Sequence, residues 1–253
     1  MKKVGVALGG GAAHGLAHIG VLQVLKEYDV PIHCVSGSSA GAVIGGLYCA
    51  GLDLYELANL GRTLDLNSLL DLSFGTKGFV KGNKAEEMVD VLCNGKKIEE
   101  CDILFSAVTC DIISGKSVIL NKGKISKACH ASFAMPGIFE PVEVEGMQLI
   151  DGGTMIRVPI NEVKKMGAEF VIGVDVGYQG DGHKKAESIL EIMLDAFEMS
   201  DWQNAERMKN SCNCLISPLL KNIPMHTLDK AQETIEAGRK ATLEIIDSIK
   251  KDI

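Results

Sequence analysis

The residues best suited to covalent chemistry form a short serine motif, Gly37-Ser38-Ser39-Ala40-Gly41. It fits Gly-x-Ser-x-Gly, the pattern of a nucleophile elbow, in which a serine occupies a sharp turn between a strand and a helix. The turn crowds the backbone on either side of the serine, so positions 37 and 41 need glycine. The motif predicts Ser39 as a nucleophile, with the Ala40 amide at the helix N-terminus facing a developing oxyanion. A glycine-rich helix start capped by a serine is the alternative.

A second segment, Gly9-Gly10-Gly11-Ala12-Ala13-His14-Gly15, joins the first strand to the first helix. It lacks the Gly-Lys-Ser/Thr ending of a Walker loop, and it has histidine where a dinucleotide fingerprint needs its last glycine. What remains is a row of bare backbone amides that could hold an oxyanion or a phosphate. Next to a nucleophile elbow, this loop predicts the other half of an oxyanion hole.

A serine nucleophile needs a proton acceptor. In the order Ser, Asp, His, the acceptor would be His183 or His226, after Asp151 or Asp175, although both histidines lie in polar segments typical of a surface. The block Asp151-Gly152-Gly153 is the other candidate, because two glycines let a carboxylate approach a neighbouring backbone closely. An ordinary Asp-Gly turn is its alternative interpretation.

The elements that position these residues alternate short β-branched runs with longer helical ones, which is typical of an α/β domain. We expect strands over residues 4–8, 32–36, 103–109, 117–120, 170–176 and 214–217, and helices over residues 12–28, 40–50, 126–134, 186–209 and 227–250. Asn83 and Glu86 have the spacing of a capping box, which predicts a helix from 83 to about 93. All 253 residues form one predicted domain.

Four blocks in this order resemble the patatin-like phospholipase family, especially its compact bacterial members. They are residues 9–22, residues 37–41, residues 131–142, and Asp151-Gly152-Gly153 followed by Val158-Pro159-Ile160. The resemblance is strongest over residues 4–176, and residues 186–253 add C-terminal helices and a strand that complete the domain.

The resemblance implies a patatin-like three-layer α/β/α fold with a mostly parallel central sheet. It implies a Ser–Asp dyad with Ser39 as nucleophile, Asp151 as base, no catalytic histidine, and an oxyanion hole from the amides of Gly9, Gly10, Gly11 and Ala12. The activity it implies is serine acyl-ester hydrolysis (of phospholipid, lysophospholipid or a simpler carboxylic ester) through an acyl-enzyme, without cofactor or metal. An acyltransferase using the same dyad, or a lipid-binding module with little turnover, is the alternative.

Two positions depart from the family pattern. His14 stands where family members usually carry arginine or lysine, which replaces a fixed charge by one that ordinarily titrates near pH 6.5. Thr154-Met155-Ile156-Arg157 stands where asparagines commonly follow the Asp-Gly-Gly block. Both departures bear on rate and substrate preference more than on the type of reaction.

Composition limits the partners. The chain has 26 basic and 33 acidic side chains and a net charge of −7, with no basic stripe, so we expect no nucleic-acid partner. Its eight cysteines show no zinc spacing and indicate reduced thiols and a cytoplasmic chain. The expected partner is a lipid or other acyl-ester substrate, which is compatible with transient contact with a membrane surface.

The region 52–100 is the expected lid or acyl-pocket wall, with Leu64, Leu66, Leu69, Leu70, Leu72 and Phe74 as lining residues. The oligomeric state is left open.

Overall fold

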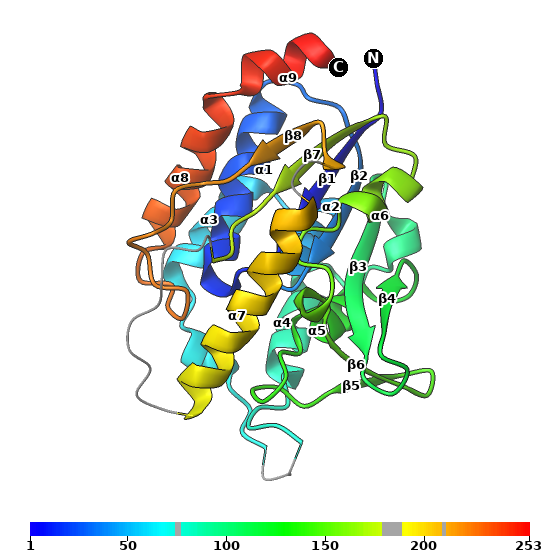
Figure 1. Ribbon diagram of the computed structural model, residues 1–253, viewed down its shortest axis with the longest axis vertical. Coiled ribbons are helices and arrows are strands. Elements are labelled where there is room, and N and C mark those ends of the chain that lie inside the picture. The colour runs from blue at the N-terminus through cyan, green and yellow to red at the C-terminus, as the bar shows by residue number, and fades with distance from the viewer. Residues whose placement is uncertain (74–76, 179–188, 209–210) are drawn as a thin grey trace.

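The computed structural model describes residues 1–73, 77–178, 189–208 and 211–253. These residues form an eight-stranded sheet in the order β5-β6-β3-β2-β1-β7-β8, with β4 also paired to β3 (Figure 1). The pairs β1–β2, β2–β3, β1–β7 and β7–β8 are parallel, whereas β3–β4, β3–β6 and β5–β6 are antiparallel. The predicted three-layer architecture with a mostly parallel central sheet is therefore confirmed.

The strands lie close to the predicted ones. Their bounds are β1 Val4–Leu8, β2 Ile32–Ser38, β3 Leu104–Asp111, β4 Lys116–Leu120, β5 Val142–Val144, β6 Met147–Asp151, β7 Phe170–Val174 and β8 Cys214–Ile216. The α-helices are α1 Ala17–Glu27, α2 Ala40–Cys49, α3 Leu54–Thr63, α4 Asn83–Leu92, α5 Ile125–Phe133, α6 Ile160–Lys165, α7 Ile189–Met208, α8 Ala231–Leu243 and α9 Ile246–Asp252. Short 3₁₀ helices are η1 Ala12–Leu16, η2 Leu66–Leu69, η3 Ile98–Glu100 and η4 Gly152–Thr154.

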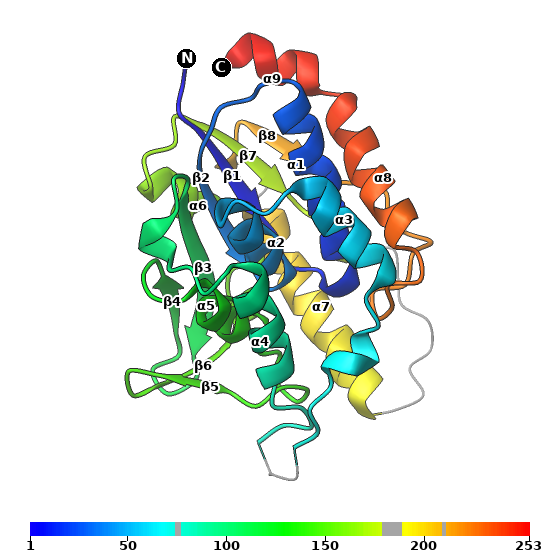
Figure 2. The same ribbon diagram turned by 180° about the vertical axis from the view of Figure 1, so that it is seen from behind.

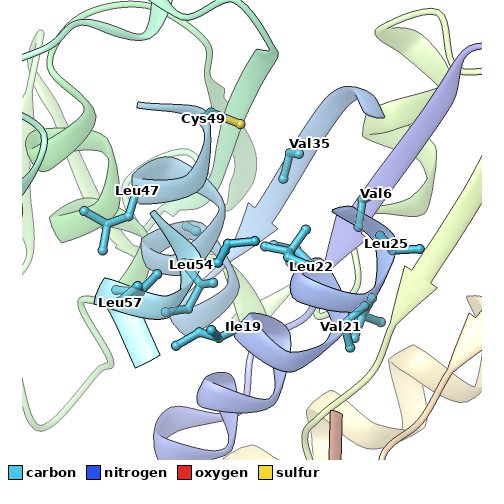
Figure 3. Packing of buried hydrophobic residues seen from close by; sticks show 14 of the residues in the cluster. Val6, Ile19, Val21, Leu22, Leu25, Val35, Leu47, Cys49, Leu54 and Leu57 are labelled. Carbon is cyan, nitrogen blue, oxygen red and sulfur yellow. The ribbon is translucent and has the colours of Figure 1, made fainter. Parts of the chain in front are cut away.

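Helices cover both faces of the sheet. Figure 1 shows α6 and α7 in front of it, and the opposite view in Figure 2 shows α1 to α5 and α8 on the other face. Successive residues of a strand point to opposite faces, so Val6 of β1 joins the larger core while Ala7 joins a smaller cluster under α6. Figure 3 shows Val6 and Val35 of the strands close to Leu22 and Leu25 of α1.

Two predicted elements need correction, and the ends of a third lie outside the described residues. The helix expected over residues 227–250 is two helices, α8 and α9, which begin at Ala231 and Ile246. The capping box predicted at Asn83 is wrong, because Asn83 is already helical. The Asp71 carboxylate caps this helix instead, by accepting hydrogen bonds from the amides of Gly82 and Asn83. The long helix predicted from residue 186 is seen from Ile189 onward, and residues 186–188 and 209 lie outside the described residues.

The region 52–100 divides into two parts. Helices α3 and α4 place Leu54, Leu57 and Val89 in the main core, so these helices belong to the body of the fold. Leu66, Leu70 and Leu72 instead have 38%, 43% and 66% of their surface exposed, and Phe74 lies outside the described residues. Within the residues that the structure describes, no helix has the length and apolar character that crossing a membrane would require.

Candidate active site

Ser39 stands on a strained turn between β2 and α2. Its backbone has φ 52° and ψ −123°, in the positive-φ region that residues with a side chain rarely occupy. A Cβ on Gly37 would lie 2.3 Å from the Gly41 carbonyl oxygen, so the predicted crowding across the turn is confirmed at that position. A Cβ on Gly41 would instead lie 2.2 Å from the carbonyl oxygen of Leu8 in β1. The second glycine of the motif is therefore required by the neighbouring strand.

The sheet brings Asp151 to this turn. β2 pairs with β3 up to Ser38 opposite Val108, and β6 pairs with the next residue of β3, placing Asp151 opposite Thr109. Since β4 occupies the other edge of β3 over these residues, β2 and β6 meet end to end along one edge. The residue that follows β2 therefore faces the last residue of β6.

Ser39 and Asp151 share a hydrogen bond. The Ser39 hydroxyl donates to Oδ2 of Asp151 over 2.6 Å, and the Gly153 amide donates to Oδ1 over 2.7 Å. Asp151 is 1% exposed and Ser39 is 8% exposed. Burial raises the pKa of Asp151 to about 6, against the opposing effect of the hydrogen bonds from Ser39 and Gly153. This carboxylate is a stronger base than a solvated one and is still mostly ionised at neutral pH.

The amides of the glycine loop are not equally available. Gly9 donates to the Val174 carbonyl over 2.9 Å and Gly10 to the Arg157 carbonyl over 3.1 Å. The sequence-based assignment of these two amides as oxyanion donors is therefore corrected: they fix the path of the loop. Gly10 also packs against Ser39, because a Cβ there would stand 3.3 Å from Cβ of Ser39.

Three amides remain for an oxyanion. Within the described residues, the amides of Gly11, Ala12 and Ala40 have no hydrogen bond to a carbonyl or side chain. Ala12 has φ 45°, a positive value that turns the chain sharply at the start of η1. Ala40 opens α2, where unpaired amides and the helix dipole favour negative charge.

Two side chains that sequence reasoning missed hold these parts in place. Ser132 of α5 accepts a hydrogen bond from the Ser39 amide at 2.9 Å and donates to the Val108 carbonyl at 2.6 Å. Nε2 of His18 lies 2.8 Å from the Gly9 carbonyl oxygen, and burial lowers the pKa of His18 to about 4, so the neutral ring donates this bond. Ser132 lay within a block shared with the family, but nothing in the sequence gave either residue a partner.

His14 is a buried residue that contacts the backbone of two other segments. Its ring nitrogens face the carbonyl oxygens of Val176 at 3.1 Å and Ile223 at 2.6 Å. Burial lowers its pKa below the ordinary value, while these two contacts oppose the shift. The expectation of a charge titrating near pH 6.5 is therefore wrong. His14 instead ties η1 to the end of β7 and to the segment before α8.

The described histidines do not contact the dyad. His130 pairs with Glu86 at 2.5 Å, and exposed His226 lies on the rim of a hollow of about 720 Å³ between the end of α3 and the start of α8. His183 lies outside the described residues. Among the residues with described positions, no group of His, Cys, Asp and Glu has a metal-binding arrangement.

Comparison with known families agrees with this geometry. Residues 6–164 match the family model described as patatin-like phospholipase, which covers more than half of the chain. This protein belongs to the patatin-like phospholipase family.

Relatives of this family member are longer than the chain itself. An uncharacterized NTE family protein of Mycobacterium tuberculosis is 37% identical over 177 residues, covering 69% of this chain and 49% of that protein. Lysophospholipase NTE1 of Yarrowia lipolytica is 31% identical over 182 residues, which are 70% of this chain and 13% of that protein. The chain thus spans about half the length of its mycobacterial relative and a small part of the yeast protein.

Solved structures confirm the fold. VipD from Legionella pneumophila matches with a TM-score of 0.68 and 15% identity, covering 98% of this chain and 67% of VipD. The type III effector protein ExoU matches with a TM-score of 0.56 and 17% identity over 98% of this chain and 53% of ExoU. At these identities the likeness concerns the arrangement of strands and helices.

Proposed function

We propose that this protein hydrolyses lipid acyl esters through a Ser39–Asp151 dyad, as a phospholipase A, lysophospholipase or carboxylesterase. The 2.6 Å hydrogen bond from the Ser39 hydroxyl to the buried Asp151 carboxylate is the observation that carries the proposal. Membership of the patatin-like phospholipase family and the name of the yeast lysophospholipase support an ester of a lipid as substrate.

The proposed reaction has two halves. Ser39 Oγ bonds to the ester carbonyl carbon while its proton passes to Asp151, and the carbonyl oxygen becomes an oxyanion facing the amides of Gly11, Ala12 and Ala40. The ester C–O bond then breaks, and Asp151 returns the proton to the departing alcohol. In the second half, water attacks the acyl carbon and gives a proton to Asp151; the bond to Ser39 Oγ then breaks, Asp151 returns the proton to Ser39, and the carboxylic acid leaves. Positioned donors contribute about 10²–10³ each in rate, so the loop matters as much as the base.

Covalent labelling tests the proposal most directly. A fluorophosphonate probe is expected to label the wild-type protein at Ser39, and the Ser39→Ala variant is expected to remain unlabelled. A folded wild-type protein that neither labels nor releases fatty acid from lysophospholipid or nitrophenyl esters would contradict hydrolysis. Product analysis with a glycerol or lysophospholipid acceptor distinguishes hydrolysis from acyl transfer, because transfer yields a new ester instead of a free acid.

We also propose that the enzyme contacts anionic lipid surfaces through residues 77–84. Phe79 is 67% exposed there, between the exposed Lys77 and Lys81, and nearby Leu72 is 66% exposed. An apolar ring flanked by lysines suits the boundary of lipid headgroups and acyl chains. Figures 1 and 2 show this segment at the end of the molecule toward which β3 runs.

Vesicle sedimentation tests this contact. Phe79→Ser combined with Lys77→Glu is expected to reduce binding to phosphatidylglycerol-containing vesicles while soluble-ester hydrolysis stays unchanged. Leu104→Ser is the control, because Leu104 is 47% exposed at the opposite end of β3. Equal sedimentation of the double variant and the wild type would contradict the proposed contact.

A further inference from the structure

Helix α7 lies across the turn that carries the catalytic carboxylate. The Phe197 ring lies 3.6 Å from the position that a Cβ on Gly153 would occupy. One helical turn further on, Asp201 approaches Arg157, with 3.6 Å between its Oδ2 and the guanidinium Nε. The next residue, Trp202, packs edge-on against Tyr178 with ring centroids 5.9 Å apart. Three contacts thus fix one face of α7 beside the dyad.

Arg157 joins α7 to the oxyanion loop. Its fully buried guanidinium donates to Oδ1 of Asp175 over 2.6 Å and to the Tyr178 carbonyl over 2.8 Å. The backbone carbonyl oxygen of Arg157 accepts a hydrogen bond from the Gly10 amide. A Cβ on Gly177 would stand 2.3 Å from the Arg157 guanidinium carbon, so that glycine lets the backbone lie against it. The same residue therefore connects the loop before η1, the end of β7 and helix α7.

The charges in this cluster are incompletely satisfied. Four buried atoms of this cluster make no hydrogen bond within the described residues: Nε and Nη1 of Arg157, Oδ2 of Asp175 and Oδ1 of Asp201. Burial and the negative charges of Asp151, Asp175 and Glu198 raise the pKa of Asp201 to about 8, although Arg157 opposes the shift. Asp201 and the catalytic Asp151 are thus close enough for the charge of one to act on the other.

We propose that Asp201 is a positioning residue for the dyad: bound to Arg157, it holds α7 over Asp151, and its ionisation places a second negative charge beside the catalytic carboxylate. This inference rests on the proposed function. In the proposed step the Ser39 proton moves to Asp151, and a negative charge beside Asp151 strengthens that base, so turnover is slower while Asp201 carries a proton and rises when the proton leaves. The charged groups that face Asp201 are Arg157 after η4, Asp175 after β7, Asp151 of β6 and Glu198 of α7 itself.

The pH profile of soluble-ester hydrolysis tests the proposal. In the wild type, kcat/KM is expected to rise about tenfold between about pH 7 and pH 9.5, because ionised Asp201 acts on the dyad in a poorly screened site. Asp201→Asn keeps the size of the side chain but cannot ionise, so its profile is expected to stay flat over that range. Asp195→Asn is the matched control, since six residues along a helix turn a side chain well away from Asp201. A rise that persists in Asp201→Asn would overturn the proposal.

The pH dependence of the melting temperature tests the buried position of Asp201 without relying on an activity assay. A carboxyl whose folded pKa is raised contributes stability that is complete below the unfolded pKa of about 3.9 and is lost as pH rises through the folded value. The melting temperature of the wild type relative to Asp201→Asn is therefore expected to fall from about pH 4 to about pH 8. A difference that does not vary with pH would overturn the inference. Absence of labelling and hydrolysis in a folded protein would overturn the proposed function alone.

Discussion

At the scale of single residues, the site depends on the surroundings of one carboxylate. Asp151 is 1% exposed, so it loses hydration, yet it accepts hydrogen bonds from Ser39 and Gly153 that favour its charged form. The balance raises its pKa to about 6. A carboxyl with this pKa is ionised at neutral pH, when it must accept a proton, and binds that proton more firmly than a solvated aspartate.

The dyad predicts a clear mutational pattern. Ser39→Ala and Asp151→Asn are each expected to lower kcat by about 10³-fold or more in folded proteins, because each removes a group that the proposed reaction requires. His226→Ala and His183→Ala are the controls, and each is expected to stay within about twofold of wild type. Steady-state hydrolysis of a nitrophenyl ester measures all four. A histidine variant as inactive as Ser39→Ala would replace the dyad by a triad.

The raised pKa of Asp151 makes two pH-dependent predictions. Hydrolysis is expected to fall as pH drops through about 6, because protonated Asp151 cannot accept the Ser39 proton. Its raised pKa also costs stability above that pH, since stability is lost between the unfolded value of about 3.9 and the folded one. At pH 7, Asp151→Asn is thus expected to have a higher melting temperature than the wild type. Its unfolding free energy is expected to be higher by up to about 3 kcal/mol. Calorimetry at pH 4 and 7 checks the sign.

At the scale of secondary-structure elements, the position of Ser39 depends on helix α5 as much as on its own turn. Ser132 bridges the Ser39 amide and the Val108 carbonyl, so α5 and β3 both fix the elbow. The strained φ of 52° at Ser39 persists because these neighbours hold it.

Removing this bridge is expected to loosen the elbow. Ser132→Ala leaves a buried amide and a buried carbonyl without a partner, so the unfolding free energy falls by about 1–3 kcal/mol. We expect kcat to fall about tenfold with little change in KM, because Ser39 is less well aligned. Ser126→Ala is the matched control on the same helix, since its hydroxyl bonds Asp90 at 2.8 Å away from the elbow. An equal loss of kcat in both variants would contradict the role of Ser132.

At the scale of the whole molecule, helix α8 near the C-terminus packs against the start of helix α1, which follows the glycine loop. Helix α8 crosses α1 so closely that a Cβ on Gly238 would lie 2.0 Å from the Ala17 carbonyl oxygen, and one on Gly20 the same distance from the Ile235 carbonyl oxygen. Ala17 directly follows η1, which begins at Ala12. The packing of α8 therefore bears on the position of the loop.

Gly238→Ala is expected to separate the two helices. The added methyl group has no space, so we expect a loss of about 3 kcal/mol in unfolding free energy. A decrease in kcat is expected with it, because η1 moves with the start of α1. Glu236→Ala, two residues earlier at an exposed position, is the control and is expected to change stability by less than about 0.5 kcal/mol. Denaturant titration compares the variants, and equal stability would contradict the close crossing.

The sequence by itself determined the local features: the serine turn at Ser39 that needs Gly37, the amide-rich loop and the alternation that defines the fold. These features depend on residues within a few positions of each other, where glycine and side-chain type restrict the backbone directly. Only the tertiary structure decided what meets across long stretches of chain. Pairing along β3 brings Asp151 to Ser39, and burial lowers the pKa values of His14 and His18 and raises the pKa of Asp201. Strand partners and desolvation are properties of the packed molecule, so no local pattern could specify them.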